Sequence, residues 1–115
     1  MTTRSRDKHQ DLYIGLVRLH VLYHAAMEPV FGQGMMQELG RHGYRLGPGT
    51  IYPLLHSMER RGWLKAQPIV VAGRRRRSYV ATRAGKGALK KAIGRVKELF
   101  NEITEVEPTD GTERL

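Results

Sequence analysis

Four consecutive arginines, Arg74–Arg77, follow a glycine at position 73. Guanidinium groups this close repel one another and cannot all be buried, so we expect them to face an anion. Backbone phosphates of nucleic acid are anions that arginine binds well. The run therefore predicts a phosphate-binding surface made by Arg74, Arg75, Arg76 and Arg77. Because alternate residues of a strand point to opposite faces, the sequence leaves open which of them make contact.

A second group of polar side chains stands at the start of a predicted helix over residues 48–61. Pro48, with Gly47 before it, suits the first turn of a helix. Hydroxyl groups there can donate to phosphates or base edges, and the free N–H groups of a helix start favour a phosphate. A proline inside this helix removes one backbone hydrogen bond and predicts a bend. The candidate DNA contacts are Gly49, Thr50, Tyr52, Pro53 and His56.

Two histidines, His20 and His24, have the i, i+4 spacing of zinc ligands on one helix face. The 115 residues contain no cysteine, and no glutamate completes an HExxH pattern. Packed or partly exposed histidines are therefore the favoured interpretation, and we expect neither a metal nor a cofactor. Gly85-Lys86-Gly87 lacks the spacing of a P-loop, and the three serines suggest no triad, so we do not expect an enzyme.

The charge is strongly basic and unevenly spread. The formal net charge is +9 with a pI of about 10.4. Residues 1–97 hold 19 basic and five acidic side chains, whereas residues 98–115 hold six acidic side chains and Arg114. A basic body with an acidic end favours nucleic acid as the partner. With no cysteine, no apolar run of about 20 residues and no signal peptide, we expect a single-domain, soluble, cytoplasmic protein without a membrane partner.

The periodicity predicts three helices over residues 11–28, 32–42 and 48–61, and a helix over 83–105. Between them we expect a hairpin over 63–82, whose two strands flank a glycine-arginine loop at residues 72–77. This order is typical of a mainly α winged helix-turn-helix with a two-stranded β-wing and a long C-terminal dimerisation helix. We expect a flexible basic arm (1–10), a DNA-binding domain (11–82), a dimerisation helix (83–106) and a disordered tail (107–115).

Smaller expectations concern single residues. Asp11 or Asp7 is the expected cap of the first helix, and Thr82 that of the last. Gly43 and Gly62 are expected to end helices. Four methionines are expected in the core: Met27, Met35, Met36 and Met58. Trp63 and Tyr79 are expected in the core rather than on a small aromatic ligand.

The last helix carries apolar residues at spacings of 4, 3, 4 and 3, a heptad-like stripe that one small domain has too little surface to cover. We therefore expect a homodimer, with the first helix contributing to the interface. The expected interface residues are Leu12, Leu16, Leu19, Leu89, Ile93, Val96, Phe100 and Ile103.

Several segments have a specific sequence: HGYRLGPGTIYPLLH at residues 42–56, ERRGWL at 59–64, GRRRRSY at 73–79 and TRAG at 82–85. Over about residues 10–105 the chain resembles PadR-like transcriptional regulators. The resemblance implies a homodimeric, DNA-binding winged-helix regulator, commonly a repressor on an inverted-repeat operator, and the single long last helix resembles the smaller members. Some relatives bind hydrophobic compounds near the dimer interface, which implies a small hydrophobic or aromatic effector.

The chain departs from the family pattern at the start of the second helix. The family usually has His-Gly-Tyr there, and the tyrosine is often associated with the DNA backbone. This chain has Phe31-Gly32-Gln33, so the resemblance carries that role to Gln33, whose amide can still donate to a phosphate.

Two other interpretations fit a basic winged domain. A basic RNA-binding or ribosome-associated protein is the first alternative, since basic charge does not distinguish RNA from DNA. The heptad stripe favours duplex DNA, because a symmetric dimer suits a palindromic site. A winged domain that binds only protein is the second alternative, and the four arginines speak against it.

Overall fold

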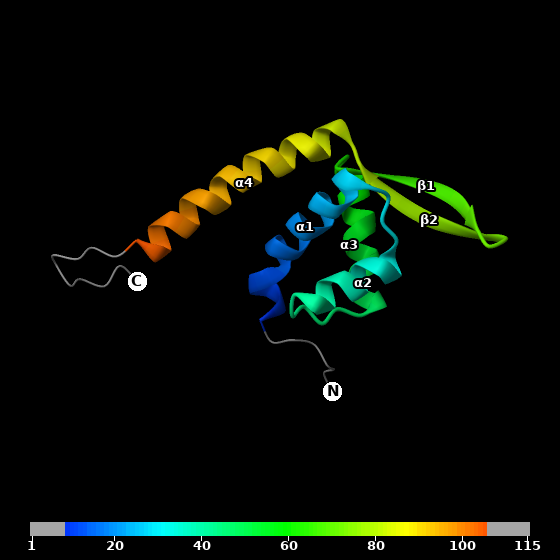
Figure 1. Ribbon diagram of the computed structural model, residues 1–115, viewed down its shortest axis with the longest axis horizontal. Coiled ribbons are helices and arrows are strands. Elements are labelled where there is room, and N and C mark those ends of the chain that lie inside the picture. The colour runs from blue at the N-terminus through cyan, green and yellow to red at the C-terminus, as the bar shows by residue number, and fades with distance from the viewer. Residues whose placement is uncertain (1–8, 106–115) are drawn as a thin grey trace.

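The computed structural model describes residues 9–105. Except for residues 9 and 10, the predicted basic arm lies outside this range, as do Asp7, residue 106 and the predicted tail. The elements are α1 (Gln10–Met27), α2 (Gly32–Arg41), α3 (Pro48–Arg60), β1 (Leu64–Val71), β2 (Arg74–Ala81) and α4 (Arg83–Thr104). Figure 1 shows α1, α2 and α3 packed together, with the hairpin and α4 extending away from them. The predicted mainly helical winged fold is confirmed.

Helix ends follow the sequence signals in most places. Gly43 and Gly62 follow α2 and α3 with φ of +92° and +81°, a left-handed conformation that favours glycine. Thr82 caps α4, because its Oγ1 accepts a hydrogen bond of 2.9 Å from the Gly85 N–H. The prediction that Asp11 caps α1 is wrong. His9 is the N-cap, and Asp11 lies in the first turn, where its charge favours the helix dipole.

The core forms where one row of α1 meets α2 and α3. Val17 and Val21 of α1 pack in one buried cluster with Leu39 of α2 and with Ile51 and Leu55 of α3. Burial of these side chains supplies the main driving force for the three-helix packing. The second apolar row of α1, which includes Leu12 and Leu16, stays exposed.

Three of the four methionines lie where the pattern predicts. Met35 and Met58 are buried, and Met36 packs partly buried against the core. The prediction for Met27 is wrong, since its side chain is 67% exposed. Met27 is the last residue of α1 and lies beyond Ala25, the last buried residue of that helix.

The hairpin is regular up to its turn. Ala72 and Gly73 both have positive φ, +51° and +78°, as in the two-residue turns that match the twist of a hairpin. The arginine run was expected to lie in the loop, and this is wrong: Arg74–Arg77 pair with Pro68–Val71 as the first half of β2. Backbone hydrogen bonds of 2.8 and 2.9 Å join Tyr79 to Val30, which ties the hairpin to the α1–α2 connection.

Candidate nucleic-acid interface

A hollow of about 520 Å³ lies between the start of α2, the start of α3 and the tip half of the hairpin. The structure thus brings together residues that the sequence suggested separately. Gln33, Tyr52 and the four arginines all line it, and so do residues that the sequence analysis did not select. These further lining residues are Phe31, Gly32, Val71 and Ala72. The hollow is open to solvent on a strongly basic surface, as a phosphate-binding surface must be.

Helix α3 turns one side to the core and the other to solvent. Ile51, Leu54, Leu55 and Met58 form its buried side. The predicted contacts lie on the remaining surface: Tyr52, Pro53 and His56 are exposed, Gly49 is exposed, and Thr50 is partly buried. Tyr52 is 38% exposed and lies against Gly32 of α2. The start of α3 therefore presents an aromatic ring and several hydroxyl and N–H groups to a binding partner.

The four arginines of β2 are held in different ways. The Arg76 guanidinium carbon lies 4.5 Å from the centre of the Phe31 ring, a cation–π contact. Arg77 Nε donates to Tyr79 Oη at 3.1 Å, and its Nη2 donates to Glu59 at 3.2 Å. The Tyr79 hydrogen bond and then that of Glu59 raise the pKa of Arg77. The expectation that all four need an external anion is therefore wrong for Arg77, which already has Glu59 as its anion. The sequence did not indicate this pair, because Glu59 is 18 residues away and no local pattern marks it.

Arg74 and Arg75 are exposed, and their side chains make no hydrogen bond or ion pair with another residue in the range 9–105. They flank the turn of the hairpin, directly after Gly73. Their backbone is fixed by pairing with Val71 and Val70. Of the four arginines, these two have guanidinium groups that are free for an external anion.

Arg18 is a candidate that the sequence analysis missed. It lines a second hollow of about 290 Å³ beside Gly49, Thr50 and Pro53 of α3. Its Nε is buried and has no hydrogen-bond partner among the described residues. Arg18 is the single Lys or Arg within Gln10–Met27. A single arginine in a helix that is mainly apolar between Leu12 and Met27 was the signal that could have identified it.

The predicted dimer residues lie on the outer faces of α1 and α4. Leu12 is 74% exposed and Phe100 is 62% exposed, and Leu16, Ile93, Val96 and Ile103 are exposed as well. Leu19 and Leu89 are partly buried, because the first part of α4 packs against α1 there. The apolar stripe of α4 continues well beyond that contact, with Leu99 also exposed.

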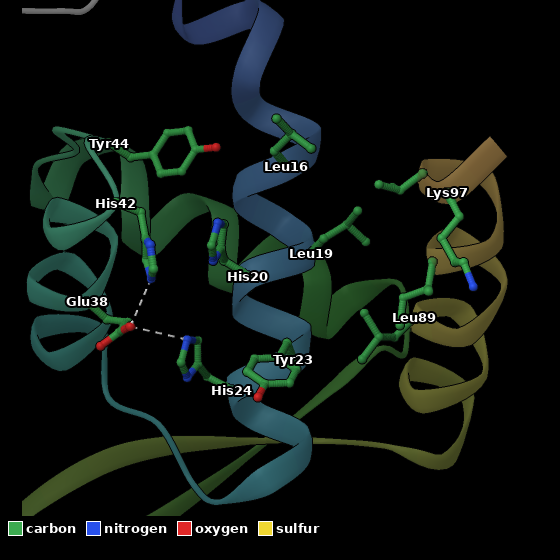
Figure 2. A pocket seen from close by; sticks show the side chains of 12 residues that line it. Leu16, Leu19, His20, Tyr23, His24, Glu38, His42, Tyr44, Leu89 and Lys97 are labelled. Carbon is green, nitrogen blue, oxygen red and sulfur yellow. Dashed lines mark hydrogen bonds and ion pairs between the residues drawn. The ribbon is translucent and has the colours of Figure 1, made fainter. Parts of the chain in front are cut away.

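A cavity of about 570 Å³ lies between α1, the end of α2 and α4. Its apolar wall includes five of the predicted dimer residues, Leu16, Leu19, Leu89, Ile93 and Val96. Figure 2 shows Leu19 turned toward Leu89 of α4, while His20 and His24 turn toward Glu38 and His42. The cavity therefore has an apolar side formed by α1 and α4 and a polar side formed by α1 and α2.

The polar side is organised around Glu38. Its carboxylate lies 2.6 Å from Arg41, 3.1 Å from His42 Nε2 and 3.5 Å from His24 Nε2. The hydrogen bond with His42 lowers the pKa of Glu38. The His20 ring stacks on the His42 ring at 4.7 Å, and burial, followed by the nearby His42 and His24, lowers the pKa of His20. Within residues 9–105 no group of three or more His, Cys, Asp or Glu side chains is arranged to hold a metal ion.

Tyr79 is 1% exposed and belongs to the core, as expected. Trp63 packs partly buried against the same core, and Arg61 stacks over its ring at 5.4 Å. None of the helices within the described range combines the length and the apolar character that crossing a membrane requires.

The sequence and the fold are matched by known proteins. A family model described as the transcriptional regulator PadR-like family matches residues 21–91. The chain belongs to the PadR-like family of transcriptional regulators. The family predicted from the motifs in residues 42–85 is thereby confirmed. Regulators of this family act by binding DNA and not as enzymes.

Individual relatives match most of the chain. The chain is 51% identical to the transcriptional regulator Rv3488 of Mycobacterium tuberculosis over 87 residues. These residues cover 76% of this chain and 81% of the relative. It is similar to the crystal structure of a PadR-like regulator from Bacillus cereus, with a TM-score of 0.71 and 26% identity over 84% of this chain and 99% of the other. A PadR family regulator from Eggerthella lenta shares the fold, with a TM-score of 0.74 and 24% identity over 87% and 88% of the two chains.

Proposed function

We propose that this PadR-like regulator is a homodimeric repressor that binds an inverted-repeat DNA operator. The observation that carries the proposal is the basic hollow, which joins the exposed start of α3, the start of α2 and the arginine strand in one surface. In a winged helix-turn-helix, a helix of this kind enters the major groove while the wing meets the backbone. The hollow lies between this helix and the wing, and its arginines carry the charge that binds the phosphates of a DNA strand.

Within this surface, base and backbone contacts fall to different residues. Tyr52, Thr50 and His56 stand on the exposed side of α3, where they reach base edges. Gln33 and Gly49 lie at the starts of α2 and α3, where they approach phosphates. Arg74, Arg75 and Arg76 follow the backbone along β2, and Pro53 and Arg77 shape the surface beside them. Arg18 adds a cation next to the start of α3.

The second copy of the chain covers the apolar faces of α1 and α4. At about 1.5 Å per residue, the 22 residues of α4 extend roughly 33 Å, well beyond the part that α1 covers. A stripe of this length exposed to water favours association with an identical stripe. The two-fold symmetry then presents two α3 helices to successive major grooves.

The charges of α4 indicate that the two α4 helices run antiparallel. Six basic side chains occupy Arg83–Lys97, and Glu98, Glu102 and the C-cap Glu105 follow. This order opposes the helix dipole, which favours acidic residues at the start of a helix and basic residues at its end. An antiparallel partner places the acidic half of one helix beside the basic half of the other, and so offsets the unfavourable order.

The cavity between α1 and α4 is the proposed site for a small hydrophobic or aromatic effector. Its volume of about 570 Å³ falls within the usual range of ligand sites, and its apolar wall is made of predicted dimer residues. A ligand there bears on the contact between α1 and α4. It therefore changes the spacing of the two α3 helices and releases the operator.

The test is binding to the DNA upstream of the protein's own gene, compared with a scrambled duplex over a range of salt concentrations. We expect the upstream DNA to bind roughly 1,000-fold more tightly, with a preference that persists as salt rises. Equal and steeply salt-dependent binding to both duplexes would contradict the proposal, and single-stranded RNA would then be the next ligand tested.

A further inference from the structure

Gly32, the first residue of α2, is in direct contact with the Tyr52 side chain of α3. Gly32 is buried. A Cβ added to it would lie 2.6 Å from Tyr52 Cζ and 2.8 Å from Tyr52 Oη. Carbon atoms of folded proteins do not approach this closely. The Tyr52 ring therefore fills the space that any side chain at position 32 would need.

The backbone gives no other reason for a glycine at this position. The glycines with positive φ among the described residues are Gly43, Gly62 and Gly73, so Gly32 has a conformation that any residue adopts. It lies in a helix, where alanine is favoured over glycine. The contact with Tyr52 is what remains to account for the missing side chain.

The group that an added methyl would meet is the far end of a side chain. Tyr52 is 38% exposed and lines the basic hollow, so its ring has room to turn away from α2. An alanine at position 32 would therefore displace the ring rather than the backbone. Gly34, two residues along the same helix, has no atom within 4 Å of an added Cβ.

We propose that Gly32 is a positioning residue for DNA recognition. Because it has no side chain, the Tyr52 ring can lie against the start of α2. This inference rests on the proposed function, in which Tyr52 contacts the DNA. In this position the hydroxyl of Tyr52 lies at the junction of α2, α3 and the hollow. Gly32 thereby sets which atoms of the groove Tyr52 reaches.

The experiment is a double-mutant cycle on the full chain, with Gly32→Ala, Tyr52→Ala and both changes together. The probes are a duplex selected by the wild-type protein from a randomised pool and a scrambled duplex of equal length. We expect Gly32→Ala to lower the preference for the selected duplex by roughly tenfold. It should change binding to the scrambled duplex little, and Gly34→Ala should behave as the wild type.

In the Tyr52→Ala background, Gly32→Ala should have almost no further effect, because the ring that it displaces is gone. If Gly32→Ala folds poorly, the double variant should recover the thermal midpoint, which supports the same contact. A wild-type preference in Gly32→Ala, together with a reduced preference in Tyr52→Ala, overturns the inference and leaves the proposed function intact. Effects of the two changes that simply add also overturn it. A wild-type preference in both variants removes Tyr52 from the interface, and the inference with it.

Discussion

The four wing arginines are consecutive residues of the same type, but their surroundings in the fold differ. Arg77 is held by Tyr79 and Glu59, and Arg76 stacks on Phe31, whereas Arg74 and Arg75 are exposed beside the turn. A guanidinium group that is already paired must give up that partner before it binds a phosphate. The contribution of each arginine to DNA binding therefore depends on contacts that arise only in the fold.

Replacing Arg74 and Arg75 with alanine should weaken binding to all duplexes alike, because phosphate contacts carry no base information. The slope of log K against log salt should fall by about one unit for each phosphate that the variant no longer binds. Fluorescence anisotropy with two unrelated duplexes, from about 50 to 200 mM salt, measures this slope. Arg77→Ala is the matched control and should leave the slope nearly unchanged. An equal change in that control would show that Glu59 releases Arg77 when DNA binds.

The lowered pKa of His20 predicts a stability that depends on pH. The folded protein binds a proton at His20 less readily than the unfolded chain does, in which the pKa of this histidine is 6.5. The unfolded state therefore holds more protons between the lowered pKa and 6.5, and the free energy of unfolding falls as the pH falls through that window. The groups that face His20 are His24, His42, Glu38 and Tyr44.

Urea unfolding measured across this window, with His20→Gln beside the wild type, checks the prediction. The variant should lose less stability on acidification, because glutamine does not titrate. His56→Gln, on the exposed side of α3, is the control and should keep the wild-type dependence. Identical curves for the wild type and His20→Gln would show that another group carries the effect.

At the scale of the elements, Gly85 fixes how α4 leaves the winged domain. A Cβ on Gly85 would clash with the backbone carbonyl oxygen of Trp63 and lie 3.0 Å from its carbon. This carbonyl also accepts a hydrogen bond from the Thr82 N–H, so the loop before β1 and the start of α4 are held together. Neither backbone can turn aside in the way that the Tyr52 side chain can.

Gly85→Ala should therefore lower the free energy of unfolding by about 1–3 kcal/mol. Gly87→Ala is the control in the same helix, since no atom lies within 4 Å of its added Cβ. There alanine should be neutral, or stabilise by up to about 1 kcal/mol through its helix propensity. Both are measured by urea unfolding at one protein concentration, because dimer formation contributes to stability. Equal stability of the two variants would contradict the close approach at Gly85.

The sequence predicted most of the elements, because their signals are local. Proline and glycine positions, the Thr82 cap and the 3.6-residue periodicity act within one or two turns of the chain, and all lie where the pattern placed them. Failures occurred where a longer-range contact decided the outcome. The arginine run became part of a strand because Pro68–Val71 pairs with it. A smaller error was local, since the N-cap of α1 is His9 and not Asp11.

At the scale of the whole molecule, the proposed antiparallel dimer places Glu98 and Glu102 of one α4 beside the basic half of the other. Changing both glutamates to lysine should weaken self-association, and changing Lys90 and Lys91 to glutamate should do the same. Combining the four changes should restore association, because the opposite charges are then exchanged between the halves.

Sedimentation equilibrium at low salt measures these changes against the 13.1 kDa mass of one chain. In a parallel arrangement like charges would already face one another, and the reversals would leave association unchanged. That result would reject the antiparallel arrangement while leaving the dimer itself in place.

The winged fold, the exposed start of α3, the basic wing and the apolar stripe of α4 could all be predicted from the sequence. Each depends on residue types at short, regular spacings, which local backbone geometry converts directly into an element and a face. The tertiary structure alone decided that Tyr52 rests on Gly32, that Arg76 meets Phe31, that Glu59 holds Arg77 and that Arg18 lies beside α3. These partners are many residues apart in the sequence, and only the packing of the helices against one another and against the hairpin brings them into contact.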